Sequence, residues 1–337
     1  MKVNISIAGV IFYFLVVTSL SAQDIHLSQY HFDRLQINPA LTGMFNGDKQ
    51  MALLYKSQWA NVPVEYSTFS GSFDMKLRKT QTPKGFFSIG GLFNYDQAGD
   101  GNLSLGSLTF NGSYTRALSK SFFVTLGGAV GGGQRKFDIT GLLFESQWVM
   151  EQPCPTCPNN ENFESSFFYL DLSGGINLRL QGKDRTKIDL GVGAFHLNEP
   201  TYTFSKTGDD TSLPIRTAFS ALGVLKLANR LDLYGNGLLQ QQGPYEETLA
   251  GGGVIIHISN KKAREVELHL GVATRFDDAI IPMIALGYDG WKGGFSYDIT
   301  TSPFQTANNQ KGGPEFFLTY TYKKLWPLEQ TKVCSIF

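Results

Sequence analysis

The first residues of this sequence that could carry chemistry lie in the stretch DIHLSQYHFDRLQINPALTG, residues 24–43. Its candidate groups for nucleophilic or acid–base work are Asp24, His26, Ser28, His31 and Asp33. A serine nucleophile needs a histidine base that a carboxylate holds in fixed geometry, and closeness in sequence does not supply that geometry. We therefore interpret the stretch as a structural strap or partner-contacting element, turned by Asn38-Pro39 toward the first strand.

A second candidate site is the motif PCPTCP, which places Cys154 and Cys157 between prolines. A zinc site would need further ligands beside this one pair. An exported protein keeps disulfides, so a local disulfide is the favoured interpretation, with a metal site as the weaker alternative. Cys334 is left over, as a free thiol or an attachment point.

Export is indicated by the start of the chain. One lysine, an apolar run from Ile5 to Val17 and then small residues are typical of a secretory signal peptide, with cleavage after Ser21 or Ala22. Later stretches fall short of the roughly 20 apolar residues that a spanning helix needs.

The composition narrows the class of protein. Only 17% of the residues are charged, 13% are aromatic, 37 are glycine, and the net charge is zero. This balance gives no basic footprint for nucleic acid. Together with the signal peptide, this composition favours an all-β protein with a single domain.

The elements that must position these residues are strands. Apolar and polar residues alternate with period 2, as in REVELHLGVATRF (264–276) and KIDLGVGAF (187–195). Fourteen such segments have about the length of a tilted strand crossing a bilayer. They centre on residues 49–57, 65–78, 84–95, 103–117, 121–136, 166–180, 186–198, 214–227, 230–241, 247–258, 264–275, 280–288, 291–300 and 314–323.

The connections between these segments alternate in length. Every second connection is short and turn-like, whereas the intervening ones include 137–165, 199–212 and 302–313. Outer-membrane barrels have short periplasmic turns and longer outer loops. Because free strand edges cannot be satisfied in hydrocarbon, the sheet must close on itself. We therefore predict an all-β, transmembrane antiparallel β-barrel of about fourteen strands; a soluble sandwich is the alternative.

Three residue types then have expected positions. Strand arginines and lysines should face the lumen or the interfaces, where pairing with Asp171, Asp189, Asp232 and Glu267 is favoured over a selectivity ring: Arg135, Lys136, Arg179, Arg216, Arg230 and Arg275. Tryptophans should lie at strand ends and interface girdles rather than stack on a ligand: Trp59, Trp148, Trp291 and Trp326. The glycine runs 127–133 and 250–253 should allow bends or close approach of a plug, loop or partner.

Several blocks, in order, resemble one family. They are LSQYHFDRLQINPALTG, LLYKSQW, GQRKFD, FESQW, GAFHLNEP, FDDAIIPMIALGY, GGFSYDI and GGPEFFLTY. The chain is similar over nearly its whole mature length to the PorP/SprF family of type IX secretion system outer-membrane proteins. The terminal KVCSIF keeps only Cys334 and Phe337 of a Cys-Pro-Arg-Phe-like tail that many members carry.

The resemblance implies a noncatalytic barrel that serves export or surface attachment of proteins such as gliding adhesins. From the residues we expect no cofactor and no metal. The partners of the barrel would be outer-membrane lipid, a secreted surface protein outside, and periplasmic secretion components, with no nucleic acid. The candidate partner-binding residues are Ser28, Gln29, Tyr30, Asn38, Pro39, Gly43, Gln58, Trp59, Gln147 and Trp148.

The expected organisation is a signal peptide (1–22), a strap (23–47), a barrel (48–325) and a periplasmic tail (326–337). We expect the mature N-terminus in the periplasm, with apolar strap residues bound in the periplasmic mouth: Leu27, Tyr30, Phe32, Leu35 and Ile37. The leading hypothesis is an accessory or anchor in the outer membrane. The alternatives are a passive small-solute channel and an outer-membrane hydrolase.

Overall fold

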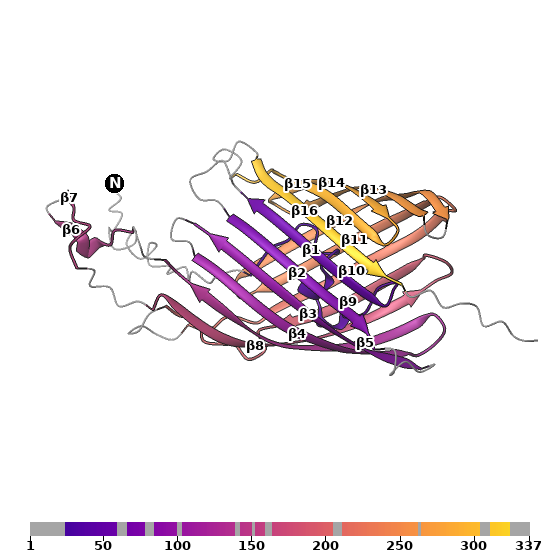
Figure 1. Ribbon diagram of the computed structural model, residues 1–337, viewed down its shortest axis with the longest axis horizontal. Coiled ribbons are helices and arrows are strands. Elements are labelled where there is room, and N and C mark those ends of the chain that lie inside the picture. Colours follow the sequence, from indigo (N-terminus) through magenta and orange to yellow (C-terminus); the bar gives the residue numbers. More distant parts are fainter. Residues whose placement is uncertain are drawn as a thin grey trace, which may run out of the picture.

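The computed structural model describes residues 24–58, 66–77, 84–99, 103–138, 142–149, 152–158, 164–204, 211–261, 264–303 and 311–323. Fourteen antiparallel strands form a closed barrel in which β1 pairs with both β2 and β16 (Figure 1). The barrel strands are β1 (Lys49–Gln58), β2 (Tyr66–Lys76), β3 (Gly85–Ala98), β4 (Leu103–Ala117), β5 (Phe122–Lys136), β8 (Ser166–Gln181), β9 (Lys187–Phe195), β10 (Arg216–Ala228), β11 (Leu231–Gln242), β12 (Tyr245–Lys261), β13 (Arg264–Arg275), β14 (Ala279–Tyr288), β15 (Trp291–Thr300) and β16 (Lys311–Tyr322). The predicted fold class and all fourteen segments are confirmed.

The alternation in sequence is what sorts the two faces of the wall. In β14, Ala279, Ile281 and Ala285 are buried toward the lumen, whereas Ile280 and Ile284 are exposed on the outside. The other strands follow the same period, so the exterior carries a dense array of exposed Phe, Leu, Ile and Val side chains. An apolar exterior of this kind suits hydrocarbon, where every backbone group must be paired within the barrel.

The two ends of the barrel differ in their connections. One end has tight turns, such as Asp289-Gly290, where both residues have positive φ and Tyr288 pairs with Trp291. The other end has the long connections, and one of these carries a separate two-stranded sheet, β6 (Trp148–Val149) with β7 (Gln152–Pro153), outside the barrel (Figure 1). By the usual orientation of such barrels, the tight turns face the periplasm and the long connections face outward.

The interior is occupied by residues 24–47, which we call the lumenal segment. It contains two 3-10 turns, η1 (Arg34–Gln36) and η2 (Pro39–Leu41). Its apolar side chains form two buried clusters with inward-facing residues of the wall, one around Tyr30, Ile37, Leu41 and Met44 and one around Ile25 and Leu27. The segment is therefore part of the core of the barrel.

The course of the lumenal segment corrects the expected position in the periplasmic mouth. Asp24 contacts Gln242, at the end of β11 on the long-connection side, whereas the Met44 carbonyl lies near the tight turns and accepts from Arg179. The described chain thus starts at the outer end, not the periplasmic one, and runs through the lumen to β1. The physical reason is that the outer half of the lumen offers charged partners for Asp24, His26 and Ser28.

No helix among the described residues is long and apolar enough to cross a membrane.

Candidate functional site

The start of the lumenal segment is fixed by an ion cluster at the outer end of the barrel. The Asp24 carboxylate lies 2.7 Å from His196 Nε2 and 2.9 Å from Arg216 Nε. His196 follows β9 with a positive φ of 58°, and its Nδ1 lies 2.9 Å from Asp171 of β8. The end of β9 and the start of β10, which one outer connection joins, therefore both hold the lumenal segment.

These contacts set the protonation of the cluster. Burial disfavours the charged imidazolium, but Asp24 and Asp171 outweigh burial and raise the pKa of His196 to about 9. Burial alone would raise the pKa of the Asp24 carboxyl, yet His196 and Arg216 hold it well below its usual range. Asp24 and His196 therefore form an ion pair near neutral pH.

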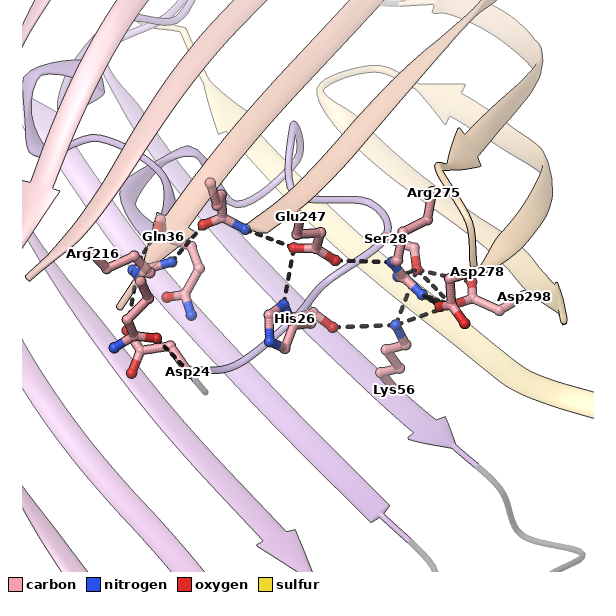
Figure 2. Close-up of polar contacts among 12 residues, drawn as sticks. Asp24, His26, Ser28, Gln36, Lys56, Arg216, Glu247, Arg275, Asp278 and Asp298 are labelled. Atoms are coloured by element: carbon pink, nitrogen blue, oxygen red, sulfur yellow. Dashed lines mark hydrogen bonds and ion pairs between the residues drawn. The ribbon is translucent and has the colours of Figure 1, made fainter. Parts of the chain in front are cut away.

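Ser28 lies at the centre of a second cluster (Figure 2). Its Oγ donates to Asp298 at 2.8 Å, and it accepts from Arg275 at 2.8 Å and Lys56 at 3.1 Å. Its backbone N–H donates to Glu315 at 2.8 Å. The Lys56 side chain is only 1% exposed and lies 3.1 Å from Asp298. Four strands, β1, β13, β15 and β16, thus converge on one serine.

A polar chain joins the two clusters across β10, β11 and β12. Arg216 donates to Gln240 at 2.7 Å, and Gln240 donates to Glu247 at 2.9 Å. Glu247 lies 2.9 Å from both His26 Nδ1 and Arg275 Nε. Figure 2 shows His26 between the two clusters with Glu247 beside it. The outer half of the segment is bonded along its length rather than at one point.

The next predicted partner-binding residues also contact the wall of the same barrel. The Gln29 N–H donates to Glu315 at 2.7 Å and its amide donates to Ser296 at 2.7 Å. The Tyr30 hydroxyl donates to Asn236 at 2.9 Å. Ser28, Gln29 and Tyr30 are all buried, so in this structure they bind the barrel itself rather than an outside partner.

The Asn-Pro-Ala turn is fitted to a glycine-rich part of the wall. Asn38 caps η2 by accepting from Ala40 N at 2.8 Å, Pro39 is its first residue, and the Asn38 amide donates to the Ile176 carbonyl at 3.0 Å. A Cβ at Gly127 would collide with the Ala40 backbone, and one at Gly193 would collide with the Ile37 carbonyl. Gly127 lies in the run 127–133, where the sequence predicted bends or close approach of a plug, loop or partner, and the structure shows close approach of the lumenal segment. Gly193 plays the same part outside the predicted runs.

Gly43 ends the fitted part of the segment. It has a positive φ of 76°, a conformation that favours glycine, and its N–H donates to Asp74 at 2.6 Å. The buried Gly43 therefore also has a structural position in this barrel.

The remaining predicted residues lie at the outer end. Gln147 is buried within the loop, where its amide donates to the Cys157 carbonyl at 3.0 Å. Trp148 is 50% exposed, and Cys154 and Cys157 form a disulfide beside it. Gln58 is the last residue of β1, and Trp59 lies outside the described residues, as do residues 1–23, Trp326 and Cys334. The structure brings Ser28 to Gly43 together in the lumen and leaves the 147–148 pair apart from them.

Sequence reasoning missed Lys56, Glu247, Glu315 and His196 as partners of the segment. Lys56 and Glu315 are buried charges that each adjoin an exposed aromatic residue, Tyr55 and Phe316 respectively. The alternation along the strands therefore indicated that both charges face inward. No group of three or more metal-ligating side chains suited to an ion occurs among the described residues. The Ser28 hydroxyl is bonded to a carboxylate, an ammonium and a guanidinium instead of the histidine base that a catalytic triad requires.

A closed barrel with a polar, filled lumen and an apolar exterior defines the class of outer-membrane β-barrel proteins. Within that class the family is given by the sequence. The model of the type IX secretion system membrane protein PorP/SprF family matches residues 19–320, so the chain belongs to this family and resides in the outer membrane.

The chain is similar to several solved structures, and the first of these supports the fold. A Pseudomonas aeruginosa FadL homologue has 10% identity and a TM-score of 0.50, with 85% of this chain and 92% of that chain covered. The monoaromatic hydrocarbon channel CymD has 8% identity and a TM-score of 0.49, covering 90% and 95%. The Pseudomonas putida toluene transporter TodX has 8% identity and a TM-score of 0.47, covering 89% and 94%. No curated protein sequence matches the chain.

Proposed function

We propose that this protein is a noncatalytic anchor of the type IX secretion machinery, serving export or surface attachment of a secreted surface protein such as a gliding adhesin. The observation that carries the proposal is the lumenal segment, which fills the barrel from the outer ion cluster to the tight turns. Because the lumen is filled, other proteins would contact the barrel at its two ends. Family membership indicates that these proteins would belong to the type IX secretion system or be its cargo.

On the outer side, the contact with cargo would be made by the long connections. The loop that contains β6 and β7 extends beyond the barrel (Figure 1). Its described residues include exposed Leu143 and Trp148. The Cys154–Cys157 disulfide and the β6–β7 pair restrain its shape. Exposed tryptophan on a restrained support is a common anchor in protein interfaces.

On the periplasmic side, the tight turns present more exposed basic than acidic side chains. Among the described residues, exposed basic side chains at this end include Lys49, Lys84, Arg116, Lys120, Lys183, Arg230, Arg264 and Lys323, against exposed Asp184, Glu265 and Asp289. This balance suits an acidic surface on a periplasmic component of the machinery, because complementary charge steers association. The lumenal segment itself is not available for that contact in this structure.

A passive channel is the competing function, and conductance separates it from the anchor. Purified full-length protein in planar bilayers should give no steady open-channel current, because the lumenal segment occupies the pore. Steady current from the unmodified protein would favour the channel. The hydrolase alternative is opposed by the burial of Ser28 among charged groups, where no substrate has access.

The functional test is deletion of the gene in its native host, followed by measurement of the secreted adhesin on the cell surface. Restoring the native gene should recover surface display. Restoring a Leu143→Ala/Trp148→Ala variant should leave the barrel in the membrane but lower display, whereas Leu118→Ala, an exposed residue at the opposite end, should not. Unchanged display after gene deletion would reject the proposed role.

A further inference from the structure

A groove of about 480 Å³ lies on the outside of the barrel, across β3, β4, β5 and β8. Its sides are large exposed apolar residues, with Phe168 76% and Leu170 73% exposed, joined by Phe93 and Leu108. Its floor includes Gly106 and Gly132. The lining residues of β5 and β8 lie two to four positions from the ends of those strands at the long-connection end, which places the groove in the outer half of the membrane.

The groove exists because glycine replaces side chains in the middle of an otherwise bulky surface. Neighbouring outward positions on β4 hold Leu108 and Phe110, whereas Gly106 leaves open space, since a Cβ built there would meet no heavy atom within 4 Å. The hollow is therefore a gap in the apolar coat of the barrel. Unfilled apolar gaps forfeit dispersion contacts, so an occupant is favoured.

A small cavity lies directly behind the groove, between the lumenal segment and the wall. It measures about 60 Å³ and shares Ser107, Gly132 and Tyr169 with the groove. A cavity of this size holds only a few water molecules. The strands between the cavity and the groove are paired without interruption at Gly132, so the two hollows lie on opposite faces of the wall.

We infer that this groove is a binding site for one acyl chain of an outer-leaflet membrane lipid, with the chain packed between Phe168, Leu170 and Leu108 over Gly106 and Gly132. The occupant is indicated by the place, because the groove opens on the surface that lipid covers. Its volume lies within the roughly 300–1,000 Å³ of ligand sites. Because lipid tails are as apolar as the groove, selectivity comes from close packing rather than from exclusion of water. This site is independent of the proposed anchoring role.

The test is photolabelling of the full-length protein in detergent micelles with phosphatidylethanolamine that carries a diazirine on one acyl chain. Labels on the β8 stretch that contains Phe168 and Leu170 are counted by mass spectrometry as the lipid is titrated. The wild type should label saturably. Gly106→Trp fills the groove and should lower labelling there at least fivefold. Gly112→Trp is the matched control, because Gly112 lies on the same strand and face, has the same open space, and does not line the groove.

The outcome is decisive in either direction. Loss in Gly106→Trp but not in Gly112→Trp supports the site, whereas equal labelling in all three proteins, or equal loss in both variants, overturns it. Folding of each variant is checked by its compact migration on an unheated gel. A second pair guards against misfolding: Phe168→Ala removes one side of the groove and should lower labelling two- to threefold, whereas Phe110→Ala, exposed on the same surface outside the groove, should not.

Discussion

The lumenal segment is held in different ways by two parts of the barrel wall. Toward β13, β15, β16 and β1, Ser28 and Gln29 are held by buried ionic groups. Toward β5, β8 and β9, residues 37–40 fit against glycines with only a few hydrogen bonds. The ionic part has discrete partners that fix the register of the segment. The glycine part fixes how closely the segment approaches the wall, so the two parts should fail differently when changed.

The largest effect should come from breaking the ionic part at Lys56. In Lys56→Met, the buried Asp298 and Glu315 lose the ammonium group between them, at 3.1 and 3.9 Å. Removing one partner of a buried pair costs roughly 3–5 kcal/mol. We expect that loss in the free energy of unfolding, measured by urea titration in detergent.

Two further variants sharpen the Lys56 result. Lys49→Met removes an exposed lysine at the start of the same strand and should change the free energy of unfolding little. Adding Glu315→Gln to Lys56→Met should recover part of the loss, because fewer uncompensated charges remain. A Lys56→Met protein as stable as the wild type would show that the ionic part contributes nothing.

The next effect should come from overfilling the glycine part. Gly127→Val places a side chain where the Ala40 backbone lies, and overpacking costs roughly 1–3 kcal/mol. That penalty raises the population of a displaced segment by about 5- to 150-fold. We expect intermittent current in planar bilayers from this variant but not from the wild type.

Gly128→Val is the control for that measurement. Gly128 is the adjacent residue, and a Cβ there meets only the Ser173 carbonyl, at an ordinary 3.7 Å. This variant should remain closed. Current from Gly128→Val equal to that from Gly127→Val would mean that displacement of the segment is not the cause.

The difference between the two parts also explains what the sequence could predict. Strand number and parity are set by local alternation, so the inward position of Arg179, Arg216 and Arg275 was predictable. The ion partners of these arginines were predicted only in part. Arg179 pairs with Asp189, as expected. Asp171 instead pairs with His196, and Arg216 pairs with Asp24. Partner identity depends on the stagger between strands and on the path of the lumenal segment. Neither is encoded in a local pattern, so the periplasmic mouth was as compatible with residues 24–43 as the lumen.

A smaller effect should result from Asn38→Ala at the glycine part. The change removes the cap of η2 and the bond to the Ile176 carbonyl, together worth about 1–3 kcal/mol. We expect faster amide exchange at residues 38–42 and a slightly lower free energy of unfolding. Asn46→Ala, an exposed position in the same segment, should leave both unchanged. Equal exchange in the two variants would show that the Asn38 side chain does not hold the segment in place.

The most local effect should be a pH dependence confined to the ionic part. The pKa of His196 is raised to about 9 in the folded protein, against about 6.5 for an unfolded histidine. Its stabilising contribution is therefore fully present below about pH 6.5 and is lost as the pH rises through 9. The lowered pKa of Asp24 acts only in acid, below the range tested.

Amide hydrogen exchange can resolve this dependence if exposure times are scaled to the intrinsic rate at each pH. Between about pH 6.5 and 9.5, exchange at residues 24–29 should become faster in the wild type, by up to about 100-fold if the whole shift in the pKa of His196 acts on this stretch. In His196→Gln it should already be fast at the lower pH and should change little, because the titrating contact with Asp24 is gone. Residues 40–44 should stay constant in both proteins, because glycine fit rather than His196 holds the start of that stretch. A pH response of equal size in both stretches would show that the segment moves as one unit, and the distinction between an ionic part and a fitted part would then have no consequence for its motion.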